Sequence, residues 1–100
     1  MDKEERIAGC LGLAARARQV SSGEFAVLEL IRKGRASIVL ADEELGVNTR
    51  KKIENACKAH GVPLCRMSAG RLARAIGGDG KKVAAMAASG LADKIKEIIT

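Results

Sequence analysis

One stretch decides the fold class: ASIVLA, residues 36–41. The run is short, apolar and without alternating polar residues, as expected of a strand that is buried on both faces. Such a strand lies in the middle of a sheet, and helices have to cover both faces of that sheet. Helical periods occur on either side of the run. The sequence therefore predicts an α/β fold, a three-layer α/β/α sandwich with a small mixed central sheet.

Two helices are predicted before this strand. From Glu4 the apolar positions recur at helical spacing, and the first helix is expected to end near Arg16. Residues 20–23 break that period, and Ser22 is a candidate cap for a second helix, which Gly34 would stop. The side chains expected to face inward are Ile7, Cys10, Leu11 and Ala14 in the first helix and Val27, Leu30 and Ile31 in the second.

After the strand, the chain alternates again between helices and short apolar runs. A polar loop at residues 42–44 precedes a third helix, which Asn48 or Thr49 would cap and Gly61 would end. Residues 62–67 read as a second buried strand, Ser68 as the cap of a fourth helix, and residues 83–87 as a third strand before a last helix. The inward positions of the later helices are Ile53, Ala56, Cys57, His60, Leu72, Ala75, Ile76, Leu91, Ile95, Ile98 and Ile99. No repeat or linker divides residues 1–100, so one domain is expected.

The composition favours a protein that meets a polyanion. Lys and Arg outnumber Asp and Glu by 18 to 12, which gives a net charge of +6, although basic proteins are also common for reasons of solubility alone. Phe25 is the only aromatic residue, which argues against modules that stack single strands on aromatic platforms. Three cysteines and a charged opening predict a reducing, cytoplasmic setting. No apolar run reaches the roughly 20 residues of a membrane span.

Other motifs give little support for metal binding or catalysis. Cys57-x-x-His60 with Cys65 nearby supplies only three possible ligands. His60 beside a helix end is better explained as a C-terminal cap than as a base, since no nucleophile motif surrounds it. The glycine-rich residues 77–80 precede a strand, whereas a nucleotide loop follows one and opens a helix. We therefore expect no cofactor, no metal and no catalytic residue.

Two segments are candidates for anion binding. Ser21-Ser22-Gly23-Glu24 is a turn of small residues that opens a helix, where free backbone N–H groups can meet phosphate oxygens. Residues 50–52, Arg-Lys-Lys, lie at the start of the third helix, where the helix dipole disfavours cations. The first segment is also an ordinary helix start, and the second is also explained as a solvated basic face.

Several motifs together resemble one family. In chain order they are residues 11–14 (LGLA), 20–24 (VSSGE), 31–36 (IRKGRA), 48–52 (NTRKK), 62–63 (VP) and 75–77 (AIG). Their order and spacing are similar, over essentially the whole chain, to the L7Ae/L30e ribosomal-protein superfamily, and most of all to its bacterial YlxQ-like branch. The resemblance implies an α/β/α sandwich that binds kink-turns, which are sharp bends in duplex RNA built around sheared G·A pairs.

The resemblance also implies which residues would read the RNA. Archaeal members open the second helix with glycine, one intervening residue, asparagine and glutamate, and place a lysine three residues on. Gly23 matches the glycine, but Phe25, Ala26 and Glu29 stand at the three polar positions. The bacterial branch also lacks the asparagine-glutamate pair but usually keeps a basic residue at the third position. Glu29 is a departure even there, because a carboxylate cannot donate to a guanine edge.

A second contact surface is implied in the loop after the strand that begins near Val62, where Arg66 would reach phosphate or guanine and Met67 would pack on a flipped base. The expected RNA-binding residues are Ser22, Gly23, Glu24, Phe25, Arg66, Met67, Ser68 and Arg71. The function implied is that of a cytoplasmic, non-enzymatic, ribosome-associated protein that binds a kink-turn or similarly bent structured RNA, with ribosomal RNA among the candidates. The oligomeric state is left open, with a monomer favoured. The alternative is a protein-interaction module that keeps the fold, has lost the RNA and uses Phe25 and Ala26 as an apolar patch.

Overall fold

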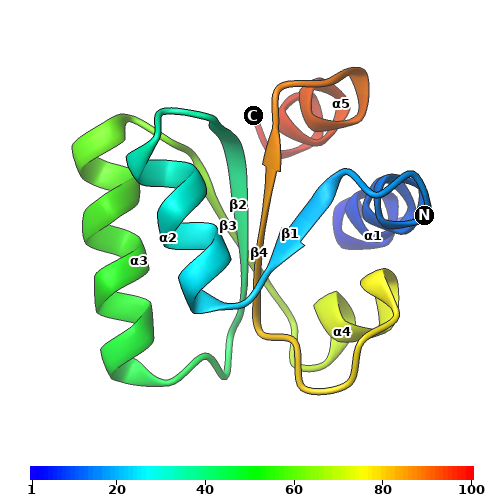
Figure 1. Ribbon diagram of the computed structural model, residues 1–100. Coiled ribbons are helices and arrows are strands. Elements are labelled where there is room, and N and C mark those ends of the chain that lie inside the picture. Colours follow the sequence, from blue (N-terminus) through cyan, green and yellow to red (C-terminus); the bar gives the residue numbers. More distant parts are fainter.

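The computed structural model describes all of residues 1–100 and has the predicted three layers (Figure 1). Four strands form one mixed sheet in the order β1-β4-β2-β3, in which β2 and β3 are parallel and the other two pairs antiparallel. The elements are α1 (Lys3–Arg16), β1 (Val20–Ser22), α2 (Glu24–Arg32), β2 (Ala36–Asp42), α3 (Val47–His60), β3 (Leu64–Met67), α4 (Arg71–Ile76), β4 (Val83–Ala87) and α5 (Gly90–Ile99). The α/β/α fold predicted from the sequence is confirmed.

The central strand β2 is covered from both sides. Ile38 and Leu40 face the core under α1, α4 and α5, and Val39 and Ala41 face the core under α2 and α3. All four are buried, which agrees with a strand that carries apolar residues at consecutive positions. Figure 1 shows α2 and α3 on one face of the sheet and the other three helices on the opposite face.

The strand β1 was not predicted. Its sequence, Val-Ser-Ser, has no apolar period, and it is a strand because Val20 and Ser22 pair with Met86 and Ala84 of β4. The segment read as a break between two helices is therefore an edge strand of the sheet.

Three predicted helix boundaries and one predicted strand need correction. Gly23, at φ 95°, is the N-cap of α2, and Ser22 is the last residue of β1. The helix α3 starts at Val47, before Asn48 and Thr49, with Gly46 as its cap. Gly70, and not Ser68, precedes α4. The strand β3 starts at Leu64 and lies at the edge of the sheet, half-buried rather than fully buried.

The predicted helix stops hold, because Gly34 and Gly61 both have positive φ. His60 was expected on the inner face of α3, but it is exposed in the last turn of that helix. No helix is both long enough and apolar enough to cross a membrane.

Candidate functional site

Four chain segments meet at one end of the sheet, where β1, β2 and β3 end and β4 begins. The register places Asp42 beside Met67, Ala41 beside Val83, and Ser22 beside Ala84. We call this region the loop end; it consists of Gly23 with the first turn of α2, residues 42–46, residues 66–70 and residues 78–82. It lies at the bottom of Figure 1.

Backbone hydrogen bonds hold these segments together. The Gly23 N–H donates to the Val83 carbonyl at 3.0 Å, the Asp42 N–H to the Lys82 carbonyl at 2.8 Å, and the Glu43 N–H to the Met67 carbonyl at 2.8 Å. The loops therefore extend the sheet by one bond each, so the groups that they present are held in fixed relative positions.

The first turn of α2 offers backbone donors at the loop end. Gly23 has no side chain to cap the helix, and no side-chain hydrogen bond caps it either. The opening N–H groups of a helix have no partner within the helix, and the positive end of the helix dipole lies there. Gly23 can hold φ 95° without the strain that other residues suffer, so the chain turns directly from β1 into α2. This arrangement can accept a phosphate oxygen.

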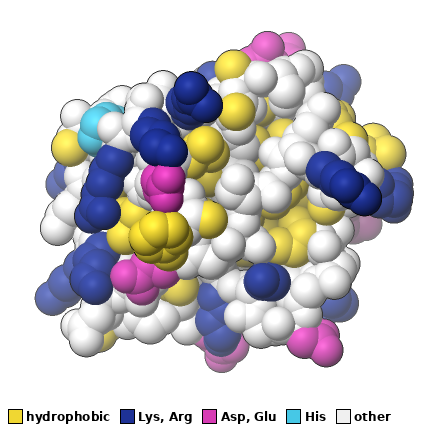
Figure 2. Space-filling view, in the orientation of Figure 1, with side chains coloured by type: hydrophobic (Ala, Val, Ile, Leu, Met, Phe, Trp, Pro, Cys, Tyr) yellow, Lys and Arg dark blue, Asp and Glu magenta, His cyan; other side chains and the backbone are white.

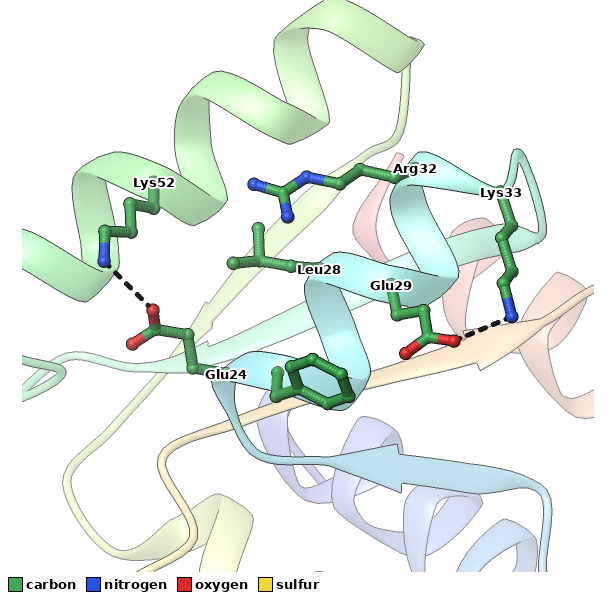
Figure 3. Close-up of a pocket in the computed structure, with 7 residues that line it drawn as sticks. Glu24, Leu28, Glu29, Arg32, Lys33 and Lys52 are labelled. Carbon is green, nitrogen blue, oxygen red and sulfur yellow. Dashed lines mark hydrogen bonds and ion pairs between the residues drawn. The ribbon is translucent and has the colours of Figure 1, made fainter.

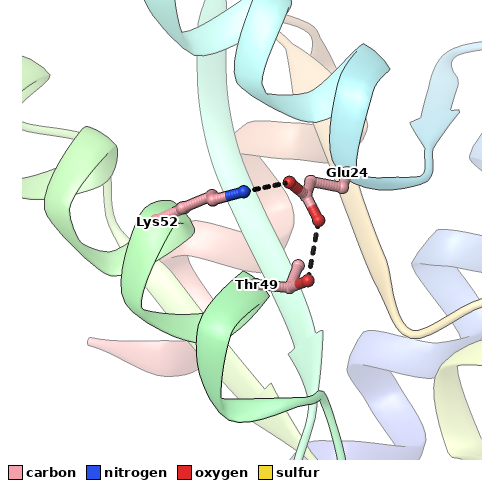
Figure 4. A network of polar contacts seen from close by, with 3 residues as sticks. All are labelled: Glu24, Thr49 and Lys52. Carbon is pink, nitrogen blue, oxygen red and sulfur yellow. Dashed lines mark hydrogen bonds and ion pairs between the residues drawn. The ribbon is translucent and has the colours of Figure 1, made fainter.

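Glu24 ties α2 to α3 (Figure 4). The Thr49 hydroxyl donates to Glu24 Oε1 at 2.7 Å, and Lys52 Nζ lies 3.3 Å from Glu24 Oε2. The bond from Thr49, followed by the bond and charge of Lys52, lowers the pKa of the Glu24 carboxyl. The carboxylate is thus directed toward α3, and Glu24 contributes to the loop end through its backbone and by positioning α2.

The three positions at which the resemblance implies polar, base-reading side chains are Phe25, Ala26 and Glu29. Phe25 is 81% exposed, although it is the only aromatic residue of the chain, and Ala26 is half-buried. Glu29 forms an ion pair with Lys33 at 2.7 Å, one turn further along α2 (Figure 3). The carboxylate that departs from the family pattern therefore has its charge partly balanced within its own helix.

Three carboxylates hold the loop between β3 and α4. The Ser68 N–H and hydroxyl both donate to Glu4, the latter at 2.7 Å, while the Ala69 N–H donates to Glu43 Oε1 at 3.0 Å and the Gly70 N–H to Asp42 Oδ2 at 2.8 Å. The bonds from the Ser68 backbone and hydroxyl, with the charge of Arg71, lower the pKa of Glu4. Three successive amides are therefore occupied by side chains of the protein itself.

This geometry changes the roles expected in that loop. Met67 is 1% exposed and belongs to the core, so its side chain does not lie where it would pack on a flipped base. Ser68 is engaged by Glu4, and the half-buried Arg71 lies close enough to Glu4 to affect its pKa. Arg66 is exposed and forms no ion pair, so its side chain is free to meet a ligand.

Asp42 organises the loop end and was not recognised from the sequence. It is 4% exposed, and its Oδ1 accepts from the Glu44 N–H at 2.7 Å while Oδ2 accepts from Gly70. Burial raises the pKa of this carboxyl, but the two backbone bonds and the charge of Lys82 outweigh burial, so the pKa lies below its ordinary value. A carboxylate directly after a buried strand was the available signal. Lys82 itself, exposed at the start of β4, was also missed.

The cysteines and the histidine do not form a cluster. The structure brings together no group of three His, Cys, Asp or Glu side chains that could hold a metal ion. All three cysteines are unpaired. Burial raises the pKa of Cys57, and burial together with the charge of Glu4 raises that of Cys65, so both stay in the unreactive thiol form.

Comparison with known proteins identifies the family. Residues 5–96 match the Ribosomal protein L7Ae/L30e/S12e/Gadd45 family, and this chain belongs to it. A Bacillus subtilis (strain 168) relative, RNA-binding protein YlxQ, is 40% identical over 90 residues, which cover 89% of this chain and 90% of that protein. RNA-binding protein YlxQ of Enterococcus faecium is 30% identical over 89% of this chain and 86% of its own length. The resemblance to the YlxQ-like branch is confirmed.

Solved structures agree with the fold. A Bacillus halodurans C protein of unknown function superposes with a TM-score of 0.86 at 31% identity, covering 93% of this chain and 95% of that chain. The Giardia lamblia 15.5kD RNA binding protein superposes with a TM-score of 0.79 at 18% identity, covering 99% and 87%. The second likeness shows the fold alone.

Proposed function

We propose that this protein binds structured RNA at the loop end, and that the class of RNA it fits is a kink-turn or a similarly bent duplex. The observation that carries the proposal is the uncapped first turn of α2, which lies at the same end of the sheet as the exposed side chains Phe25 and Arg66. Membership of the family supports it, as do two YlxQ relatives that are described as RNA-binding proteins and not as enzymes.

The backbone at the start of α2 supplies the first contact in this proposal. Ser22 and Gly23 place the amides of Glu24 and Phe25 against a phosphate at the bend, where the helix dipole adds to the attraction. No side chain competes for these amides, because the Glu24 carboxylate is held by Thr49 and Lys52 on the α3 side.

Phe25 takes a different role from the polar residue that it replaces. Its ring is exposed at the second position of α2 and has no hydrogen-bonding edge. We assign it to stacking on an unpaired base, an interaction that accepts any base because every base has a π face. Recognition then depends on the shape of the bend more than on hydrogen bonds to the sheared pairs.

Arg66, with Lys82, supplies charge for the flanking phosphates. Arg66 lies between Cys65 and Met67, which face the α1 side, and therefore projects toward the α2 and α3 side of the sheet. Figure 2 shows basic side chains spread over that side, with apolar and acidic groups among them. Ser68, Met67 and Arg71 shape the loop that carries Arg66 and are not assigned direct contacts.

The test is a titration of a kink-turn RNA and of the same RNA with its G·A pairs replaced by Watson–Crick pairs, at two salt concentrations. We expect tight binding that depends on the G·A pairs. Arg66→Ala should weaken it and reduce the slope of log K against log salt by about 0.9 per lost phosphate contact, whereas Lys58→Ala, which removes an exposed lysine of α3, should not. Equal, salt-sensitive binding to both RNAs would contradict kink recognition.

A protein-interaction module is the second candidate function. Phe25 and Val47 are 81% and 52% exposed at the starts of α2 and α3, two helices that pack together. Paired apolar residues of this kind can serve a protein partner or self-association. Light scattering over a range of concentrations distinguishes the two: a mass that doubles with concentration, and returns to the monomer in Phe25→Ser, would favour this function.

A further inference from the structure

A groove between α1 and α4 begins at the loop end, with which it shares Gly78 and Lys81, and runs beyond it. It consists of two adjoining hollows that share Ala15, Ile76 and Gly77 as lining residues. The first hollow also includes Ser22 and Lys81, and the second includes Arg16 and Arg74. One end of the groove therefore lies at Ser22, the residue before Gly23, and the groove is continuous with the loop end.

Small residues form this groove. At Gly12 a Cβ atom would lie 3.4 Å from the Ala75 carbonyl oxygen, in van der Waals contact, so only a small residue fits between α1 and α4 there. Ala15, Gly77 and Gly78 are also among the lining residues, and the Lys81 side chain lies against Gly78, where a Cβ atom would stand 2.8 Å from it. Small residues and the long basic side chains of Arg16, Arg74 and Lys81 thus share one surface, which suits an extended anionic ligand.

The charges that line the groove are all positive. Arg16, Arg74 and Lys81 are exposed, no Asp or Glu is among the lining residues, and none of the three forms an ion pair. The two ion pairs of the molecule, Lys33 with Glu29 and Lys52 with Glu24, lie on the α2 and α3 side. Cations that no carboxylate balances attract a polyanion over the whole length of the groove.

Arg18 gives an independent observation that a cation at this edge of the molecule serves a purpose other than stability. It is the only residue other than glycine with positive φ, at 60°. It follows the C-cap of α1, and its N–H donates to the Ala15 carbonyl at 3.0 Å while the Gln19 N–H donates to the Ala14 carbonyl at 2.8 Å. Glycine is the favoured residue at this point of a helix end, and an arginine there keeps a strained backbone.

We propose that the groove between α1 and α4 holds the phosphate backbone of an RNA stem that continues from the bend bound at the loop end. The inference rests on the proposed function and extends it, because the RNA would pass Ser22 and Lys81 and then lie against Arg74 and Arg16. Arg18 contributes charge just beyond Arg16. The contact reads no sequence, since only cations and backbone line it.

The experiment compares three RNAs: a kink-turn with minimal stems, the same kink-turn with one stem lengthened, and a plain duplex of the lengthened stem. The double variant R16A/R74A is compared with K58A/K94A, which removes two exposed cations outside the groove. We expect wild type to bind the long-stemmed RNA more tightly than the minimal one. R16A/R74A should lose that gain and about 1.8 units of salt slope on the long-stemmed RNA, and should bind the minimal RNA as wild type does.

Failure of this inference and failure of the proposed function give different results. If wild type recognises the kink but R16A/R74A behaves like K58A/K94A on the long-stemmed RNA, the groove is not a stem-binding surface. If wild type does not distinguish the kink, yet R16A/R74A lowers binding to the plain duplex and K58A/K94A does not, the proposed function is wrong and the groove is still a surface that binds duplex RNA.

Arg18→Gly should raise the melting temperature and weaken binding to the long-stemmed RNA. Unchanged binding would show that Arg18 is not part of the RNA-binding surface.

Discussion

At the scale of single residues, Phe25 and Glu29 both differ from the pattern that the resemblance implies, and Phe25 is the more exposed of the two. A polar side chain at this position would report on base edges, whereas an exposed phenyl ring can only stack or cover. The ring is 81% exposed, and the contact of its apolar surface with water is unfavourable in the free protein. The Phe25 ring contributes little to the fold, so it is available for an intermolecular contact.

Phe25→Ala is therefore expected to reduce RNA affinity and leave folding unchanged. The loss of one stacked base costs about 1 to 3 kcal/mol, or about 5- to 150-fold in Kd. Because the ring is exposed, the free energy of unfolding should change by no more than about 0.5 kcal/mol. Fluorescence anisotropy and urea denaturation measure the two effects, with Leu13→Ala as the control, since Leu13 is 51% exposed on α1. Equal affinities in both variants would contradict the stacking role.

The arginine at position 18 makes the fold less stable than a glycine at the same position would. Its φ of 60° is the left-handed region, which costs a residue with a Cβ atom about 1 kcal/mol relative to glycine. Arg18→Gly should raise the free energy of unfolding by about that amount and the melting temperature by about 4 to 8 °C. Calorimetry measures this, and Arg16→Gly, at the last residue of α1, should shift the melting temperature downward. A melting temperature that falls in Arg18→Gly would show that the side chain itself stabilises the fold.

At the scale of secondary structure, α1 contains two glycines with opposite roles. A Cβ atom at Gly9 would meet nothing within 4 Å, while one at Gly12 would lie 3.4 Å from the Ala75 carbonyl oxygen of α4. Gly9 is therefore free for substitution, whereas a Cβ atom at Gly12 would already touch α4, so a larger side chain would not fit between the two helices that border the groove.

Gly9→Ala should raise the free energy of unfolding by up to about 1 kcal/mol, because alanine is the better helix former. Gly12→Val should lower it by about 1 to 3 kcal/mol, because the added methyl groups push α4 away. Thermal unfolding of the two variants checks both signs. A stabilising Gly12→Val would mean that α4 moves without cost, and the groove would then be a loose feature of the surface.

Also at this scale, Asp42 joins β2 to the start of α4. Asp42→Asn keeps one acceptor oxygen and turns an amide NH₂ toward one of the backbone donors, Glu44 or Gly70. The expected loss is about 1 to 3 kcal/mol of unfolding free energy, with weaker RNA binding because the loop end loses its order. Glu44→Gln, an exposed change in the same loop, serves as the control and should behave as wild type. Wild-type stability in Asp42→Asn would show that the loops hold without this carboxylate.

At the scale of the whole molecule, acid pH should destabilise the fold. The pKa values of Glu4, Glu24 and Asp42 are lowered by hydrogen bonds that the folded state supplies, with burial opposing this most at Asp42. A carboxyl whose pKa is lower in the folded than in the unfolded state stabilises the fold above its unfolded pKa. That stability is lost as the pH falls through the folded pKa. The window lies below about pH 4.5, where the unfolded carboxyls begin to protonate.

Melting temperatures measured from pH 7 down to about pH 2 should therefore fall steadily below about pH 4.5. In Glu4→Gln the fall should be shallower, because one of the contributing groups, the partner of Ser68, no longer titrates. Glu5→Gln is the matched control, an exposed neighbour on α1 that does not bond to Ser68. A profile that is flat to pH 2, or equally steep in both variants, would mean that these bonds contribute little to folding.

Much of the fold followed from local patterns. The run at residues 36–41 predicted a doubly covered strand because burial on both faces removes the need for alternation, and the glycines at 34 and 61 predicted helix ends because left-handed backbone favours glycine. The family, too, was visible in short motifs such as VSSGE at residues 20–24. The order of glycines, caps and buried runs is a property of the sequence itself.

The tertiary structure alone decided the rest. Val20–Ser22 is a strand only because β4 lies beside it. The backbone N–H groups of residues 68–70 have acceptors only because the carboxylates of Glu4, Glu43 and Asp42 lie next to them. Likewise, the burial of Met67 and the unbalanced cations between α1 and α4 depend on segments that are distant in the chain. Pairing and charge balance are relations between such segments, so no local pattern encodes them. The sequence by itself determined the layers and the family, and only the folded chain determined which side chains are free to bind.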